Sequence, residues 1–313
     1  MPTVGLLFGM EETFPPALTE RINELGAKSK VTAEFCSVDI WKMDEPKHYD
    51  VVLDRISQDV PFYKAVLKNM MLSGTKVVNN PFWMDADEKF FSYSVCAKAG
   101  IHVPKTAIVP SKNMPPETSE KSFRNLKFPL SFEEIFEYIG LPAYFKPHAG
   151  GGWKSVYKVN TIEEFFAAYD ETADLVMTLQ ENVDFEEYYR CYCIGKSDVH
   201  IMPYEPRNPH HLRYQASFAP NEKLKAKMEK DCLTICETLG YDFNTIEFAV
   251  KGGIPYAIDF TNPAPDAEKT SIGEENFEWI LDTSAKFLIQ CAKESAKKKK
   301  PAKNMNWREL IMH

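Results

Sequence analysis

No stretch of the 313-residue sequence approaches the roughly 18 consecutive apolar residues that a membrane-spanning helix needs. The first residues, MPTVGLLFGMEETF, lack a basic segment ahead of an apolar run, so we expect a strand there and not a signal peptide. Basic residues are outnumbered, 37 Lys and Arg against 45 Asp and Glu, which gives a formal charge of −8. Because phosphate contacts need a positive surface, a net acid is a poor general binder of nucleic acid. We therefore expect no membrane and no nucleic acid as a partner.

Cysteine is scarce and forms no disulfide-like framework. The seven cysteines are odd in number and scattered, at positions 36, 96, 191, 193, 232, 236 and 291. Without an export signal, we expect reduced thiols in a cytoplasmic protein. Cys191 and Cys193 would share one face of a strand, and Cys232 and Cys236 one face of a helix, which suggests a zinc site. Small buried hydrophobes are the interpretation that we favour for these four residues.

Three familiar catalytic patterns are also missing. No G-x-G-x-x-G follows the first expected strand, at residues 3–8, so the dinucleotide fingerprint is absent. The glycines that end at Gly152 do not form a Walker loop, because Trp153 precedes Lys154 and a strand, not a helix, follows. No Ser, His and Asp residues lie in a nucleophile-elbow context. These absences exclude the commonest dehydrogenase, P-loop and hydrolase readings.

What the sequence does contain is alternating strands and helices. It is 44% hydrophobic and 26% charged, as expected for a globular protein, and its length suggests about two or three domains. Strands are expected at 3–8, 31–38, 50–54 and 75–79, with helices at 14–26 and 61–72 and Gly26 just beyond the end of the first helix. This alternation predicts a parallel α/β first domain over residues 1–85.

Capping signals mark further helices. They are Asp85 with Glu88, Ser131 with Glu134, Thr161 with Glu164, and Asn221, whose helix over 222–239 would end at Gly240. A last helix is expected at 274–293. From residue 176 onward the pattern is rich in strands, including RYQASF at 213–218.

The segment PAYFKPHAGGGWKSVYKV carries the densest functional signal. A strand delivers Lys146, then Gly150, Gly151 and Gly152 follow, and a second strand leaves. Successive glycines let backbone N–H groups approach an anion closely, since no Cβ is in the way. A lid over phosphates is one interpretation, and a flexible hairpin turn is the other.

A second signal lies in NTIEFAVKGGIPYAIDFTNP. Gly252-Gly253 is typical of a two-residue hairpin turn, with Glu247 on the first strand, Asp259 on the second and Asn262 just after it. A lone carboxylate is costly to bury in an apolar strand, and hard oxygen donors of this kind suit Mg²⁺. The alternative is that one acid points to solvent while the other caps a loop.

A third signal is LQENVDFEEYYRCYCIG. Gln180, Glu181 and Val183 end a strand whose polar backbone could bind the edge of an adenine ring. Arg190 alternates with apolar residues on the next strand, where a guanidinium needs an anionic partner.

In this order, the three signals resemble the ATP-grasp superfamily, nearest to its glutathione-synthetase and ribosomal-protein-modifying ligase branch. The resemblance covers nearly the whole chain and implies an α/β fold of the α+β grasp kind. A small Rossmann-like pre-ATP-grasp domain (1–85) would precede a two-lobed ATP-grasp domain. That domain would consist of a central subdomain with a glycine-rich lid (86–180) and a C-terminal lobe with a metal site (181–313).

The resemblance also implies roles for single residues. Phosphates would be bound by Lys89, Lys146, Gly150, Gly151 and Gly152, adenine by Gln180, Glu181 and Val183, and ribose by Glu187. The metal ligands would be Glu247, Asp259 and Asn262, Arg190 would contact the transferred phosphate, and Arg213 or Arg207 a substrate carboxylate. Two departures stand out: Asp259-x-x-Asn262 is one residue longer than the family's acid-x-Asn, and Glu187 lies three residues before Arg190.

The implied activity is an ATP- and Mg²⁺-dependent carboxylate–amine or carboxylate–thiol ligase that works through an acyl phosphate. ATP would lie between the lid and the C-terminal lobe, with Mn²⁺ as the alternative metal. The substrates would be a small-molecule or peptide carboxylate and an amine, and a homo-oligomer is left open. The alternatives are a small-molecule kinase on the same scaffold and a non-catalytic nucleotide-binding protein.

Overall fold

The computed structural model describes residues 1–44, 49–149, 154–214, 218–297 and 307–308. Its contacts group the chain into two units. Unit 1 comprises Met1–Ala86, Glu187–Phe248 and Asp259–His313, and unit 2 comprises Asp87–Glu186 and Ala249–Ile258. The division into three domains at residues 85 and 180 stays a prediction.

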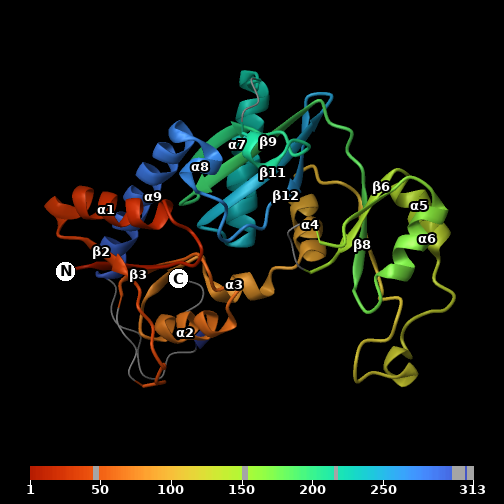
Figure 1. The fold of residues 1–313 in the computed structure, drawn as a ribbon, viewed down its shortest axis with the longest axis horizontal. Helices are drawn as coiled ribbons and strands as arrows, with labels where there is room; N and C mark the ends of the chain where they lie inside the picture. The colour runs from red at the N-terminus through yellow and green to blue at the C-terminus, as the bar shows by residue number, and fades with distance from the viewer. Residues whose placement is uncertain (45–48, 150–153, 215–217, 298–306, 309–313) are drawn as a thin grey trace. The chain divides into compact units, whose positions relative to one another are not determined.

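Unit 1 begins with a parallel four-stranded sheet of order β2-β1-β3-β4 (Figure 1). Its elements are β1 (Thr3–Leu7), α1 (Phe14–Gly26), η1 (Ala27–Ser29), β2 (Thr32–Phe35), β3 (Val51–Asp54), α2 (Pro61–Leu72), β4 (Lys76–Val78) and α3 (Pro81–Ala86). Val4 and Leu6 on β1 and Val51 and Leu53 on β3 are buried. Continuous apolar strands of this kind are typical of a parallel sheet covered on both faces. The predicted parallel α/β arrangement is confirmed.

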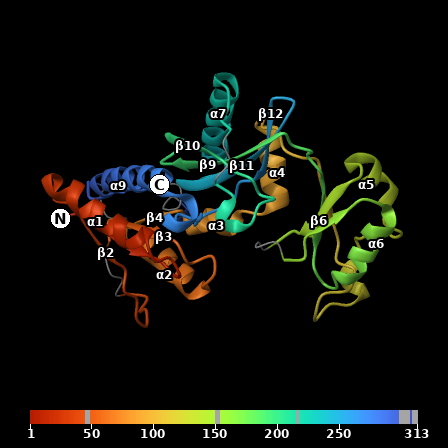
Figure 2. The ribbon, with the colours of Figure 1, turned by 45° about the horizontal axis from the view of Figure 1, so that its top comes forward.

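A second sheet, of order β10-β9-β11-β12, follows later in the chain. The elements of this part are β9 (Glu187–Ile194), β10 (Asp198–Pro203), η3 (His210–Leu212), α7 (Glu222–Leu239), β11 (Phe243–Lys251), β12 (Ile254–Asp259), α8 (Lys269–Ile272) and α9 (Glu274–Ser295). Helix α7 lies along β9 and β10 (Figure 2). The turn between β11 and β12 has Gly252 and Gly253 at φ +57° and +73°, so the predicted hairpin is confirmed.

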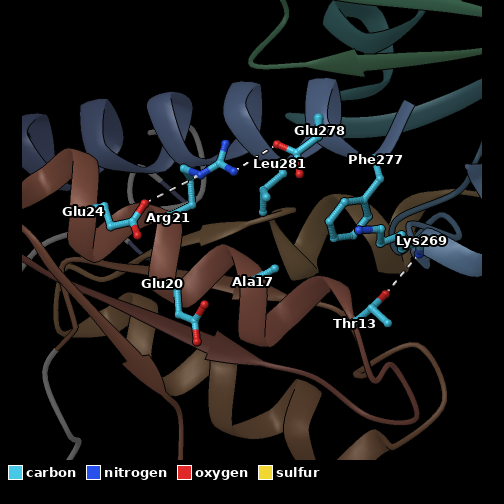
Figure 3. A pocket seen from close by; sticks show the side chains of 9 residues that line it. All are labelled: Thr13, Ala17, Glu20, Arg21, Glu24, Lys269, Phe277, Glu278 and Leu281. Atoms are coloured by element: carbon cyan, nitrogen blue, oxygen red, sulfur yellow. Dashed lines mark hydrogen bonds and ion pairs between the residues drawn. The ribbon is translucent and has the colours of Figure 1, made fainter. Parts of the chain in front are cut away.

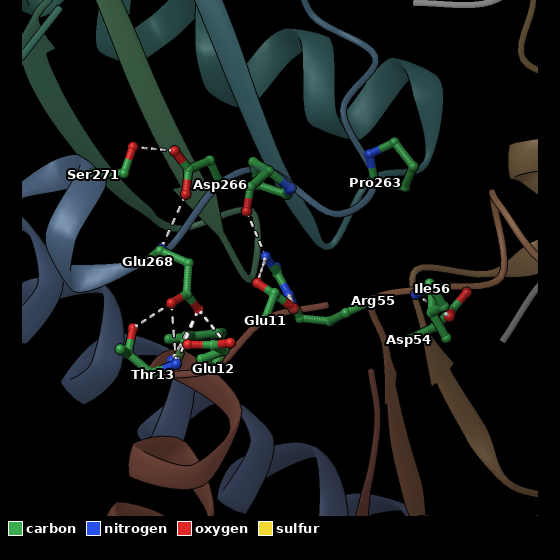
Figure 4. Close-up of polar contacts among 12 residues, drawn as sticks. Glu11, Glu12, Thr13, Asp54, Arg55, Ile56, Pro263, Asp266, Glu268 and Ser271 are labelled. Carbon is green, nitrogen blue, oxygen red and sulfur yellow. Dashed lines mark hydrogen bonds and ion pairs between the residues drawn. The ribbon is translucent and has the colours of Figure 1, made fainter. Parts of the chain in front are cut away.

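Two sets of polar contacts join the segment after β12 to the start of α1 and the end of β3 (Figure 4). The Glu268 carboxylate accepts hydrogen bonds from the backbone N–H groups of residues 12–14, at 3.1–3.3 Å, at the start of α1. Arg55, at the end of β3, binds Glu11 through Nε and Nη2 at 2.8 and 2.6 Å and also donates to the Pro265 carbonyl. The first and last parts of the chain are therefore built into one unit.

Unit 2 contains an antiparallel four-stranded sheet of order β5-β8-β6-β7. Its elements are α4 (Lys89–Lys98), β5 (Thr106–Val109), η2 (Glu120–Phe123), α5 (Phe132–Ile139), β6 (Ala143–Pro147), β7 (Tyr157–Val159), α6 (Ile162–Glu171) and β8 (Met177–Glu181). Helices α5 and α6 lie side by side (Figure 1). Phe136 and Phe165 join them at a ring-centroid separation of 5.0 Å, and Phe145 of β6 lies 4.9 Å from Phe165. This aromatic cluster anchors both helices to the strand that carries Lys146.

Several helix ends differ from prediction. Gly26 remains inside α1, and the left-handed residue is Lys30, at φ +56°. Asp85 is not an N-cap: α3 ends at Ala86, and α4 begins at Lys89 with Glu88 as its N-cap. The Asp85 carboxylate instead binds the ammonium groups of Lys64 and Lys68 on α2. Long-range ion pairing has replaced the local cap here.

Two further corrections concern Ser131 and the expected strand at 213–218. Ser131 precedes α5 but makes no side-chain cap hydrogen bond. Arg213 and Tyr214 lie in a turn, and residues 215–217 are outside the described residues. Other caps are confirmed: the Asn221 side chain accepts from Leu224 N at 3.0 Å, and Gly240 is left-handed at φ +80°. Within the described ranges, no helix is long and apolar enough to cross a bilayer.

Candidate functional site

In unit 2, Lys146 is held by a neutral partner. Its Nζ donates to Oε1 of Gln180 at 2.8 Å and lies 5.6 Å from the centroid of the Tyr93 ring. Gln180 is only 3% exposed, and its Nε2 donates to Oγ1 of Thr106 at 2.9 Å. Because β8 runs between β5 and β6, the side chain of Gln180 on β8 reaches both neighbouring strands. The amide fixes the position of the ammonium group without neutralising its charge.

The other predicted nucleotide residues of unit 2 lie at the ends of elements. Lys89 is the first residue of α4, and Glu181 ends β8. Glu181 is fixed to Lys105 by its backbone N–H, at 2.9 Å, and by its carboxylate, at 3.1 Å from the Lys105 N. Val183 follows and is buried. The predicted lid residues Gly150, Gly151 and Gly152 lie outside the described residues.

In unit 1, a partly buried arginine on β9 faces a carboxylate on β11. Arg190 Nη1 donates to the Tyr214 hydroxyl at 2.8 Å, and Nε lies 3.7 Å from Oε1 of Glu247. The guanidinium carbon is 5.6 Å from the Tyr204 ring centroid, and the buried Nε makes no hydrogen bond. Burial lowers the pKa of Arg190, but Tyr214 and Glu247 more than offset this, so the pKa is raised and the group is charged.

For Glu247, in contrast to Arg190, the surroundings disfavour the charged form. Burial raises the pKa of Glu247, Arg190 opposes the rise, and the neighbouring Asp259 adds to it. The net pKa of Glu247 therefore lies above its usual value. A hydrogen bond of 2.7 Å from the Tyr188 hydroxyl to Oε2 fixes the carboxylate. A carboxylate whose ionisation is disfavoured by burial and by a second carboxylate is typical of a functional site, where a cation would favour the ionised form.

The third predicted metal ligand is an amide. Asn262 follows β12, and its Nδ2 donates to the Thr245 carbonyl at 3.1 Å, which leaves Oδ1 as the atom for a cation. The oxygen atoms of Glu247, Asp259 and Asn262 are of the hard type that Mg²⁺ prefers, as the resemblance implies. Among the residues that the structure describes, no group of three or more His, Cys, Asp or Glu side chains is placed to hold a metal ion.

The two substrate arginines that the resemblance implies differ in their surroundings. Arg213 Nη1 donates to the Tyr204 hydroxyl at 3.3 Å, and the arginine lies near enough to Glu247 to lower its pKa. Arg207 is 66% exposed and binds Glu205 through Nε and Nη2, at 2.7 and 2.6 Å. Of the two, Arg213 lies with the buried cluster.

Sequence reasoning missed the tyrosines of this cluster. Tyr188 alternates with Arg190 along β9 and so shares its face, a signal that the sequence offered. Tyr204 and Tyr214 come from the connection after β10, where no periodicity marks them. The predicted ribose ligand Glu187 is also bound by a tyrosine, since its Oε2 accepts from the Tyr189 hydroxyl at 2.6 Å.

The four clustered cysteines lie on the opposite side of β9 from Arg190. Cys191 and Cys193 alternate with it and meet Cys232 and Cys236 of α7. All four are at most 1% exposed. Burial raises the pKa of Cys232 and Cys236, so their thiols stay protonated and act as small hydrophobes.

A surface hollow between α1 and α9 has a volume of about 300 Å³ (Figure 3). It is lined by Thr13, Ala17, Glu20, Arg21, Glu24, Lys269, Phe277, Glu278 and Leu281. Arg21 is already paired with Glu278 at 3.0 Å and with Asp282. The hollow contains none of the predicted site residues.

Comparison with known proteins adds information on the fold alone. No family model matches the sequence, and no curated protein does. A D-alanine–D-alanine ligase from Bacillus anthracis, complexed with ATP, is 15% identical over 96% of this chain and 99% of that one, with a TM-score of 0.57. The macrocyclase MdnC from Microcystis aeruginosa, bound to precursor peptide MdnA, is 15% identical over 93% of this chain and 100% of that one, with a TM-score of 0.62. A RimK domain ATP-grasp protein from Sphaerobacter thermophilus is 16% identical over 92% of this chain and 99% of that one, also with a TM-score of 0.62. The chain therefore has the ATP-grasp fold, and the predicted fold class is confirmed.

Proposed function

We propose that this chain, with its ATP-grasp fold, is an ATP- and Mg²⁺-dependent ligase that joins a carboxylate to an amine or thiol. The observation that carries the proposal is the cluster of Arg190, Glu247 and Asp259 in unit 1: the charged guanidinium lies 3.7 Å from Glu247, and Asp259 is near enough to raise the pKa of Glu247. Solved structures of this fold contain ATP in one case and magnesium with ADP in another, which supports a nucleotide as a substrate here.

The nucleotide would be held mainly by residues of unit 2. Lys146, fixed by Gln180, and Lys89 would bind phosphate oxygens, and the glycines at 150–152 would add backbone N–H groups. The end of β8 at Glu181 and the buried Val183 would contact adenine, and ribose is the role that the resemblance implies for Glu187. The hydrogen bond to Gln180 orients the Lys146 ammonium group, and a positive charge in a fixed position favours phosphate binding.

The metal would be held by Glu247, Asp259 and the Oδ1 atom of Asn262, with Mn²⁺ as an alternative to Mg²⁺. When bound, the ion neutralises phosphate charge during phosphoryl transfer. At an effective dielectric of about 20, two unit charges at 4 Å interact by about 4 kcal/mol. Two adjacent carboxylates therefore bind a cation more strongly than either does alone.

Two successive bond exchanges make up the proposed reaction. A substrate carboxylate oxygen attacks the γ-phosphorus, the bond to ADP breaks, and Arg190 offsets the charge on the transferred phosphoryl group. Arg213 or Arg207 would orient the carboxylate. The amine then attacks the acyl carbon, phosphate leaves, and the proton from nitrogen passes to water. A peptide is one candidate substrate, because the neighbour MdnC is bound to a precursor peptide in its structure.

The proposal is tested by phosphate release from ATP and Mg²⁺ with pooled acids, peptides and amines. We expect release only when an acid and a nucleophile are both present. A stable phosphorylated acceptor without condensation would indicate a kinase instead, and nucleotide binding without turnover a non-catalytic protein.

A pair of arginine variants makes this test specific to the site. Arg190→Met should lower the rate about 10²-fold or more, as loss of a group that stabilises the transition state does. Arg21→Met is the matched control, because Arg21 is also paired with carboxylates but lies at the α1–α9 surface. Equal rates for the two variants would contradict the role of Arg190.

A further inference from the structure

A fully buried asparagine on β11 forms hydrogen bonds to the backbone just beyond the end of β12, where pairing between β11 and β12 stops. Asn244 is 0% exposed, its Oδ1 accepts from the Asn262 backbone N–H at 3.0 Å, and its Nδ2 donates to the Phe260 carbonyl at 2.8 Å. Strand β12 has already ended at Asp259. The side chain thus satisfies two backbone groups that strand pairing no longer serves.

The same short segment is held by a second contact to β11. The Asn262 side chain donates through Nδ2 to the carbonyl of Thr245 at 3.1 Å. Only the NH₂ end of an amide can bond to a carbonyl, so this contact fixes which way the amide faces. In the residues that the structure describes, Asn262 Oδ1 accepts no hydrogen bond. The oxygen is therefore oriented and available.

We infer that Asn244 is a positioning residue that holds residues 260–262 so that Oδ1 of Asn262 can bind the metal together with Asp259. This inference rests on the proposed function. The extra residue in Asp259-x-x-Asn262 would shift the amide along a regular strand by one position and onto the other face. Residues 260–262, however, lie beyond the end of β12 and are held by Asn244. Their side chains therefore need not alternate between the two faces of the sheet, and the extra residue does not prevent Asn262 from facing the same way as Asp259.

The arrangement is unusual for a residue with a purely structural task. A buried amide carries a desolvation cost that an apolar strand residue avoids, and the neighbours Ile246 and Phe248 on the same face of β11 are apolar and buried. Asn244 makes its two shorter hydrogen bonds, at 2.8 and 3.0 Å, to the segment that carries Asn262, and its Nδ2 also donates to Sγ of Cys236 on α7 at 3.8 Å. Supports of metal ligands typically contribute about 10- to 100-fold to metal affinity.

The test is a titration of Mn²⁺ into protein and ATP, with free Mn²⁺ followed by electron paramagnetic resonance and compared with the same titration into ATP alone, because ATP itself binds Mn²⁺. Asn244→Ala should raise the Mn²⁺ dissociation constant about tenfold or more, and the Mg²⁺ concentration needed for half-maximal phosphate release should rise in step. The matched control is Asn23→Ala. Asn23 also bonds a backbone in both directions, to Ala33 at 3.1 and 2.8 Å, but lies on α1 outside the site, so its variant should bind Mn²⁺ like the parent.

The outcomes separate the two proposals. If the parent protein binds no Mn²⁺ with ATP, the proposed function fails. If the parent and Asn23→Ala bind but Asn244→Ala binds equally well, only the positioning role fails, even where Asn244→Ala is less stable. If Asn244→Ala does not fold, exchange of the Asn262 amide hydrogen in the metal-free parent decides. Slow exchange supports a preformed segment, and exchange at the rate of an open loop overturns it.

Discussion

The Tyr188 hydroxyl donates a hydrogen bond to Oε2 of Glu247 at 2.7 Å, across two strands of the second sheet and 59 positions of sequence. This bond favours the ionised form of the carboxylate, against the effect of burial. It also selects one rotamer of Glu247, since the oxygen must stay within reach of the phenol. Glu247, one of the proposed metal ligands, is thus ordered by the chain itself.

Removal of that hydroxyl should weaken metal binding without unfolding the protein. For Tyr188→Phe we expect a roughly tenfold higher Mg²⁺ requirement for phosphate release and a loss of about 1 kcal/mol in the free energy of unfolding. Tyr49→Phe is the control, because the Tyr49 hydroxyl also bonds a glutamate, Glu34 at 3.0 Å, within the first sheet. Equal Mg²⁺ requirements for the two variants would contradict the positioning of Glu247.

The raised pKa of Glu247 predicts a pH dependence of stability in the absence of metal. The folded protein holds the Glu247 proton to higher pH than the unfolded chain, whose carboxyl titrates near 4.5. The stabilisation is therefore complete below about 4.5 and is lost as pH rises through the folded pKa. We expect the free energy of unfolding of the parent, minus that of Glu247→Gln, to fall over this window in urea titrations with chelator present.

The metal should reverse this loss. Addition of Mg²⁺ and ATP at neutral pH should stabilise the parent by mass action and leave Glu247→Gln nearly unchanged. A difference between parent and variant that does not vary with pH would show that the carboxyl is not disfavoured in the folded state.

The charge of Lys146 should matter for nucleotide affinity and little for folding. We expect Lys146→Met to raise the ATP dissociation constant at least about tenfold, which corresponds to about 1.4 kcal/mol. Lys112→Met is the control within unit 2, since Lys112 is paired with Asp170 at 2.5 Å on the surface. Isothermal titration with ATP and Mg²⁺ measures both variants. An unchanged affinity for Lys146→Met would remove this lysine from the site.

The features that the sequence predicted correctly are those with local causes. The Gly252-Gly253 turn, the Asn221 cap and the Gly240 end each follow from residues within a few positions of one another. Gly240 is further restricted, because an added Cβ would lie 2.9 Å from the Trp83 ring. The parallel order of the first sheet also followed, from alternation of strands and helices.

The features that could not be predicted depend on contacts over long distances in sequence. Asn79 Oδ1 accepts from the backbone N–H groups of Asp242 and Phe243, both at 2.8 Å, and its Nδ2 donates to the carbonyls of Phe243 and Pro263. In the sequence, Asn79 only marks the end of a strand. Asp85 failed as a cap for the same reason: lysines on another helix attract its carboxylate more than a local amide does. The predicted metal ligands and Lys146 had motif support, and strand alternation marked Tyr188, whereas Asn244, Tyr204 and Tyr214 had no such signal.

Glu268 provides the clearest test of such a long-range cap. Thr13, at the N-cap position of α1, makes no side-chain cap of its own, and the Glu268 carboxylate binds its backbone N–H at 3.1 Å and its hydroxyl at 2.8 Å. A carboxylate at a helix N-terminus satisfies unpaired N–H groups and interacts favourably with the helix dipole. Glu268→Ala should therefore lower the free energy of unfolding by about 1–2 kcal/mol, and Glu268→Gln by less, because an acceptor oxygen remains. Glu24→Ala, at an exposed position on the same helix, should change the free energy of unfolding by less than about 0.5 kcal/mol.

Urea unfolding at low and high salt distinguishes the hydrogen bonds of Glu268 from its interaction with the helix dipole, since added salt weakens only the charge-dependent part. A Glu268→Ala protein as stable as Glu24→Ala would show that α1 begins without this cap.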